Sequence, residues 1–70
     1  MEWTERPHFA EFLIWVAKPE KRWIASVAAL PRQGGLYTAG PGEEVIPGDF
    51  DTAENAEKAA QRYIIQKRGR

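Results

Sequence analysis

A chain of 70 residues that contains no cysteine has to reach a stable fold by packing alone. Disulfides and thiolate metal sites are excluded, and a domain this small buries only about 60% of the surface that its unfolded chain exposes. The one histidine, His8, has no second histidine with which to build a conventional zinc site. Three Trp, three Phe and two Tyr supply the material for a core. We therefore expect one small domain that uses no metal and no cofactor.

Two apolar segments near the start predict a β-hairpin. Residues 8–17 are rich in aromatic and β-branched side chains and predict a single strand with apolar residues on both faces. Residues 22–30 predict a second strand, and the turn between them contains Pro19, which presets the backbone angle of a type I turn. Residues 1–7 are polar and include Pro7, so we expect them to form a flexible leader.

The middle of the chain predicts a loop and then a third strand. Residues 31–42 are rich in glycine and proline, and residues 36–38 within them are a weaker candidate for a short extra strand. Residues 43–50 contain Val45 and Ile46 and predict the third strand. Pro47 interrupts that segment, which indicates an edge strand or the end of a strand.

The clearest prediction is a helix that begins after Asp51 and ends at Gly69. Asp51 and Glu54 have the spacing of a capping box, with Asp in place of Ser or Thr. Glu54 and Lys58 form a favourable pair four residues apart. Residues at helical spacing form one stripe that can face a sheet: Ala53, Ala56, Ala60, Tyr63, Ile64 and Lys67.

Together these segments predict an α+β fold. We expect a three-stranded antiparallel β-meander followed by one C-terminal α-helix packed on one face, in the order β-β-β-α. The domain would span residues 8–68, with residues 1–7 as the leader and residues 69–70 as a tail.

Aromatic side chains on the strands predict an interaction surface. One helix covers one face of a small sheet, so the other face would still carry large apolar groups, and exposed aromatic clusters usually mark an interface. Phe12, Trp15 and Trp23 are the residues we expect there, in contact with a second copy of the chain or with another protein. The alternative is that the leader and the long loop cover both faces internally.

Basic side chains give the second candidate site. Lys21, Arg22, Arg32, Lys67 and Arg68 are candidate contacts to nucleic acid. Trp23 directly follows Arg22, and aromatic side chains are platforms on which nucleobases stack. The formal net charge of zero favours a solvated surface instead, because nucleic-acid binders usually carry a net basic excess.

No pattern of residues predicts catalysis. Gly34-Gly35 and Gly40-Pro41-Gly42 lack the spacing of phosphate-binding loops, and Ser26 lacks a glycine elbow. The acids of residues 43–51 miss the alternating spacing of a calcium-binding loop. We expect a protein that is not an enzyme.

The order of elements, with the helix start Phe50-Asp51-Thr52-Ala53-Glu54-Asn55-Ala56-Glu57-Lys58-Ala59-Ala60, resembles small bacterial domains of unknown function. This plan is similar to the arm-type DNA-binding domain of phage integrases and to the plant AP2 domain. The resemblance covers about residues 9–68. In the integrase-like families the sheet enters the major groove, which would place Arg22, with Ser26 or Arg32, toward DNA. The strands of this chain are more apolar than those DNA-reading sheets.

The start of the chain lacks the pattern of a secretory signal, and its longest apolar run, residues 12–17, is too short to cross a bilayer. We expect a cytoplasmic protein with no membrane partner. Our first prediction of function is a non-catalytic interaction module that self-associates through an aromatic sheet face or edge. The second is a weak nucleic-acid-binding module that uses the basic turn and the C-terminal tail.

Overall fold

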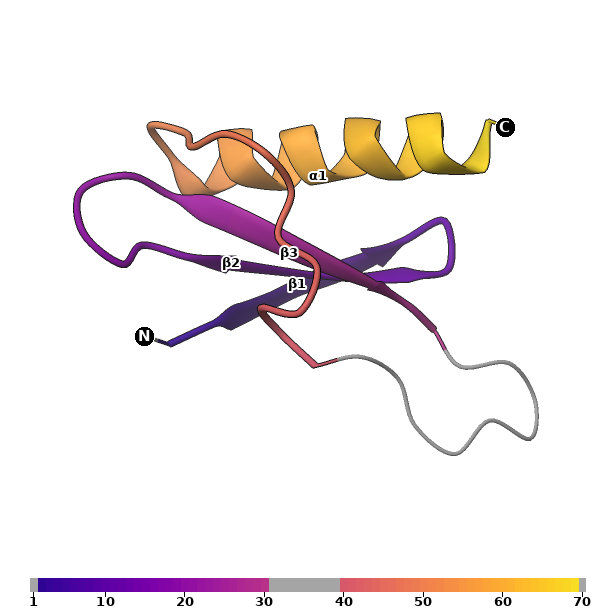
Figure 1. The fold of residues 1–70 in the computed structure, drawn as a ribbon, viewed down its shortest axis with the longest axis horizontal. Coiled ribbons are helices and arrows are strands. Elements are labelled where there is room, and N and C mark those ends of the chain that lie inside the picture. Colours follow the sequence, from indigo (N-terminus) through magenta and orange to yellow (C-terminus); the bar gives the residue numbers. More distant parts are fainter. Residues whose placement is uncertain (1, 31–39, 70) are drawn as a thin grey trace.

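The computed structural model describes residues 2–30 and 40–69. One sheet has the strand order β1-β2-β3, from β1 (Thr4–Phe9), β2 (Phe12–Ala17) and β3 (Ile24–Ala29), and all pairings are antiparallel. The helix α1 (Ala53–Arg68) lies across this sheet and packs on β2 and β3 (Figure 1). These elements confirm the predicted α+β class and the β-β-β-α order. The helix is neither long nor apolar enough to span a membrane, and no other helix occurs in the described parts of the chain.

The predicted single strand over residues 8–17 is wrong, because a tight turn divides it. Ala10 and Glu11 connect β1 to β2, and both have positive φ angles, 51° and 67°. Positive φ at both central residues defines the type I′ turn, which matches the twist of a two-residue hairpin. Such turns usually carry Asn-Gly, and Ala-Glu gives no such signal. The apolar pattern therefore looked continuous through the turn.

The flexible leader predicted for residues 1–7 is also wrong from Thr4 onward. Thr4 pairs with Val16 and Arg6 pairs with Ile14, so this segment is the first half of β1. Pro7 is compatible with a strand here because β1 lies at the edge of the sheet, where a missing backbone donor is tolerated.

The third strand predicted over residues 43–50 does not form as a continuous element. We call these residues the edge segment, because they run beside β3 and make only two isolated bridges, Ser26 with Val45 and Trp23 with Phe50. Pro47 and Gly48 lie between the bridges and interrupt the pairing. The candidate short strand at residues 36–38 lies outside the described residues.

The core lies between α1 and one face of the sheet. Ile14 pairs with Val27 across β2 and β3, and both side chains are fully buried. Ala56 and Ala60 are also fully buried, so the small alanines let the helix approach the strands closely, as their stripe predicted. The buried cluster comprises Ile14, Val16, Ala25, Val27, Ile46, Ala56, Ala60 and Ile64.

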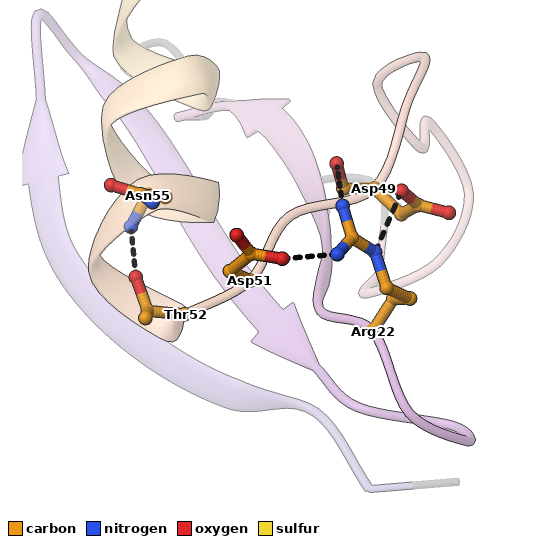
Figure 2. Close-up of polar contacts among 5 residues, drawn as sticks. All are labelled: Arg22, Asp49, Asp51, Thr52 and Asn55. Carbon is orange, nitrogen blue, oxygen red and sulfur yellow. Dashed lines mark hydrogen bonds and ion pairs between the residues drawn. The ribbon is translucent and has the colours of Figure 1, made fainter.

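The helix begins and ends with defined caps. Thr52 is the N-cap, with φ −135° and ψ 160°, and its hydroxyl accepts a hydrogen bond of 3.0 Å from the Asn55 backbone N–H (Figure 2). The predicted cap, Asp51, is wrong by one residue, because its carboxylate turns to Arg22 instead. At the other end Gly69 donates its N–H to the Ile65 carbonyl at 2.8 Å, which confirms the predicted stop.

One half-buried ion pair joins the first strand to the helix. Both Nε and Nη2 of Arg6 lie 2.8 Å from Oε1 of Glu57. The two side chains are 31% and 16% exposed, so the contact is sheltered from solvent. This pair connects residues 51 positions apart in the chain and holds β1 against the layer that α1 forms.

Candidate binding groove along the C-terminal helix

A groove with a volume of about 470 Å³ runs between the edge segment and α1. The edge segment contributes apolar side chains, and the helix contributes polar and basic ones. Its lining consists of Ile46, Pro47, Phe50, Asn55, Lys58, Ala59, Arg62, Tyr63 and Gln66. A concave surface with an apolar floor and a few polar groups at its rim is the usual form of a ligand site.

Backbone hydrogen bonds to β3 and to the residue before it hold the apolar wall of the groove. Ile46 donates its N–H to the Ala25 carbonyl at 3.0 Å, and its side chain is only 3% exposed. Phe50 and Trp23 exchange two backbone hydrogen bonds of 2.8 Å each. The wall is thus anchored on both sides of Pro47 and keeps its position relative to the helix.

Two cations form the opposite rim. Lys58 and Arg62 lie four residues apart on α1, so they share one face of the helix. Both are exposed, and within residues 2–30 and 40–69 neither makes an ion pair. The expected pairing of Glu54 with Lys58 is absent from these contacts. Their positive charges are therefore available to a ligand.

A polar triad lies beside one of the groove's lining residues. The Tyr63 hydroxyl donates a hydrogen bond of 2.7 Å to Oε2 of Glu44, and Lys67 binds the same oxygen. The hydrogen bond from Lys67, and after it that from Tyr63, lowers the pKa of Glu44. The same contact with Glu44 raises the pKa of both Tyr63 and Lys67. The triad joins the edge segment to the last turns of α1.

A second polar cluster lies at the other end of the helix. Arg22 donates from Nε to Oδ1 of Asp49 at 3.0 Å and binds Asp51 through Nη1, so its guanidinium lies between the two acids (Figure 2). All three side chains are about half exposed or more. The cluster connects the β2–β3 turn to the residues just before α1.

The structure does not bring the predicted nucleic-acid contacts together. Lys21 and Arg22 lie in the β2–β3 turn, near the start of α1, whereas Lys67 and Arg68 lie at the end of that helix (Figure 1). Sixteen helical residues span about 24 Å, so these pairs belong to opposite ends of the molecule. Arg22 and Lys67 are moreover occupied by acids of the same chain. Arg32 lies outside the described residues.

The predicted aromatic interface is also divided. Phe12 and Trp23 are half-buried and pack against the core cluster on the helix side, and Lys18 lies over the Trp23 ring at 5.9 Å from its centroid. Trp15 points to the opposite face, where it pairs with Ser26, and is only 8% exposed. Among the large hydrophobic residues that the structure describes, only Val45 and Ile65 are exposed. The described residues therefore form no exposed aromatic cluster.

On the sheet face away from α1, Trp3 of the predicted leader and Gly42 of the predicted loop make contacts of the kind that the alternative expected. Ser26 is fully buried, and its hydroxyl accepts a hydrogen bond of 3.0 Å from the Gly42 N–H. The Trp3 ring lies against Gly42, so close that a Cβ at this position would be 3.3 Å from Trp3 Nε1. Ser26 is thus a structural residue. His8 is exposed at the surface, 3.6 Å from Glu5.

Sequence reasoning did not single out Lys58 and Arg62 as a pair. Their spacing of four residues, on the exposed face of α1 away from the buried alanine stripe, was the available signal. This spacing does not indicate a binding site by itself, because the groove also requires the edge segment beside the helix. In the described part of the chain no three His, Cys, Asp or Glu side chains gather as a group that could hold a metal ion.

Comparisons with known proteins identified no relative of this chain. No protein-family model, curated protein sequence or solved structure matches the chain.

Proposed function

We propose that this protein is a non-catalytic interaction module that binds an acidic segment of another protein in the groove along α1. The observation that carries this proposal is the pair Lys58 and Arg62, two exposed cations that pair with no acid among the described residues, opposite an apolar wall. Arginine and aromatic side chains are enriched at protein interfaces, and apolar contact combined with charge complementarity supplies both affinity and selectivity.

Charge distribution favours a protein partner over nucleic acid. The chain has no net charge, and the edge segment, which forms the other side of the groove, also carries Glu44 and Asp49. A long polyphosphate would be repelled by these carboxylates as well as attracted by the cations. A short acidic segment can contact the two rim cations alone. The aromatic rings of Phe50 and Tyr63 in the lining, beside the rim cations, are the features that would suit single-stranded nucleic acid.

Self-association through Phe12, Trp15 and Trp23 has less support than the groove. Trp15 is buried within one chain, and Phe12 and Trp23 pack against the core of the same chain. A second copy would have to displace these contacts in order to use the rings. The groove needs no such rearrangement, because its lining is already in place.

Charge reversal at the rim tests the proposal. We would titrate the protein with a fluorescein-labelled acidic peptide library and with a mixed single-stranded DNA oligonucleotide, and follow anisotropy. Acidic peptides are expected to bind, and the K58E/R62E variant should bind at least about ten-fold more weakly, since each lost cation also becomes a repulsive anion. Amide chemical shifts should change at residues 46–50 and 58–66.

The matched control is the single variant R68E compared with R62E. Both replace an exposed arginine of α1 by glutamate, but Arg68 does not line the groove. R62E should weaken binding, and R68E should leave it nearly unchanged. Equal losses in the two variants would show a non-specific effect of charge. Binding of the oligonucleotide instead of the peptides, with the same dependence on Arg62, would assign the groove to nucleic acid and overturn the proposal.

A further inference from the structure

The spacing of the rim cations matches that of alternate residues in an extended peptide. Lys58 and Arg62 are separated by four helical residues, a rise of about 6 Å along the axis of α1. An extended chain rises about 3.3 Å per residue, so side chains two residues apart are about 6.6 Å apart and point to the same side. Two acidic residues separated by one residue would therefore each meet one cation.

The residue between those two acids would face the opposite side of the peptide. In an extended segment successive side chains alternate in direction. With the acids directed at the helix rim, the middle side chain would be directed at the accessible part of the wall, formed by Pro47 and Phe50. This wall is apolar, so an aliphatic or aromatic side chain fits it better than a polar one.

We infer that the groove recognises an extended segment with the pattern acidic–apolar–acidic in a partner protein. This inference rests on the proposed function and narrows it, from an acidic segment in general to an ordered set of three side chains. Arg62 offers a planar fork that binds a carboxylate through two hydrogen bonds, and Lys58 offers a point charge. Glu44, bound to Tyr63 and Lys67 nearby, disfavours acids placed further along the helix.

Three synthetic peptides separate the parts of this pattern. The first, Ser-Gly-Asp-Leu-Asp-Gly-Ser, carries the complete pattern, and the second replaces its Leu by Ser. The third, Ser-Gly-Asp-Asp-Leu-Gly-Ser, has the same composition as the first with the two acids adjacent. Fluorescence titration at low salt should give the first peptide the lowest Kd. The other two should bind about five-fold to ten-fold more weakly.

A charge-swap experiment distinguishes recognition from a structural effect of the substitutions. The K58E/R62E variant should no longer bind the first peptide and should bind Ser-Gly-Lys-Leu-Lys-Gly-Ser, which the natural chain is expected not to bind. An A59L variant, which fills the wall from the helix side, should remove the advantage of the Leu peptide over the Ser peptide. Far-ultraviolet circular dichroism of both variants would show that α1 is retained.

The outcomes separate this inference from the proposed function. If all three acidic peptides bind equally and R62E weakens each of them, the pattern is wrong and the groove still binds acidic segments. If the acidic peptides do not bind at any concentration tested, both the pattern and the proposed function are wrong. Binding of the lysine peptide by the natural chain would also overturn the inference.

Discussion

At the scale of single residues, Gly42 adopts a backbone conformation that is unfavourable for other residue types. Its φ angle is +89°, in the left-handed region, and the Trp3 ring occupies the space into which a Cβ would extend. Its N–H also satisfies the buried hydroxyl of Ser26. Backbone conformation, close approach and hydrogen bonding therefore all depend on this glycine.

We expect Gly42→Ala to lower the free energy of unfolding by about 1–3 kcal/mol, because it adds left-handed strain and displaces Trp3. Urea denaturation followed by Trp fluorescence measures this change. Gly40→Ala is the control, since its Cβ would meet only Oε2 of Glu43 at an ordinary 3.6 Å. The control should change stability by less than about 0.5 kcal/mol. Equal effects at the two glycines would contradict the role assigned to Gly42.

The hairpin residues Ala10 and Glu11 are strained in the same sense. Neither is glycine, and an L-residue in the left-handed region costs roughly 1–2 kcal/mol. We expect the double change Ala10→Asn and Glu11→Gly to raise the free energy of unfolding by about 1 kcal/mol, because Asn-Gly suits a type I′ turn. Chemical denaturation tests this. Glu11→Gln keeps the Cβ and should give no gain, so a gain with Gln would point to charge instead.

At the scale of elements, the start of α1 allows a test of which residue caps the helix. The sequence predicts Asp51, and the structure shows Thr52. Thr52→Ala removes the hydroxyl that accepts the Asn55 N–H and should cost about 1 kcal/mol. Asp51→Ala removes only an exposed contact with Arg22 and should cost less. Thr52→Ser should retain most of the stability. Thermal unfolding monitored at the helix signal measures all three, and the reverse order of costs would restore Asp51 as the cap.

How far the elements could be predicted depends on how local their causes are. The helix was predictable because its alanine stripe and its charge distribution lie within its own residues and the glycine that ends it follows directly. The division of residues 8–17 was not predictable, because Ala10 and Glu11 adopt a turn that their side chains do not favour. Pairing with β2 and the contact of Arg6 with Glu57 fix β1 despite Pro7.

The groove was less predictable than the fold because one side is determined by the helix itself and the other by contacts between distant parts of the chain. The helix side follows from the position of Lys58 and Arg62 relative to the buried stripe. The opposite wall depends on where residues 46–50 lie, which is set by hydrogen bonds of Ile46 and Phe50 to residues more than twenty positions earlier. No local pattern in residues 43–50 predicts these hydrogen bonds.

At the scale of the whole molecule, the contacts of Glu44 give stability a dependence on pH. Lys67 and Tyr63 lower the pKa of Glu44 in the folded state below its unfolded value of about 4.3. This contribution is therefore present above that value and is lost as the pH falls through the lower folded pKa. Since the side chains of Glu44 and Lys67 are 37% and 44% exposed, it should amount to less than about 1 kcal/mol.

We expect Glu44→Gln to be less stable than the natural chain at neutral pH and to approach it in stability below about pH 4. Glutamine still accepts a hydrogen bond from Tyr63 but has no charge for Lys67. Urea denaturation at a series of pH values between 7 and 3 measures the difference. Glu43→Gln, a neighbouring change that leaves the triad intact, serves as the control. A difference that stays constant over the whole range would contradict the assignment.

Pro7 has a consequence for how this protein behaves at high concentration. It lies in β1, at the outer margin of the sheet, and its ring nitrogen carries no hydrogen. Charged side chains precede it in Glu5 and Arg6. A strand from a neighbouring molecule that aligned with β1 would meet a missing donor and unfavourable charges, which hinders fibre growth by strand addition. We therefore expect Pro7, from which the sequence predicted a flexible leader, to disfavour amyloid-like polymerisation.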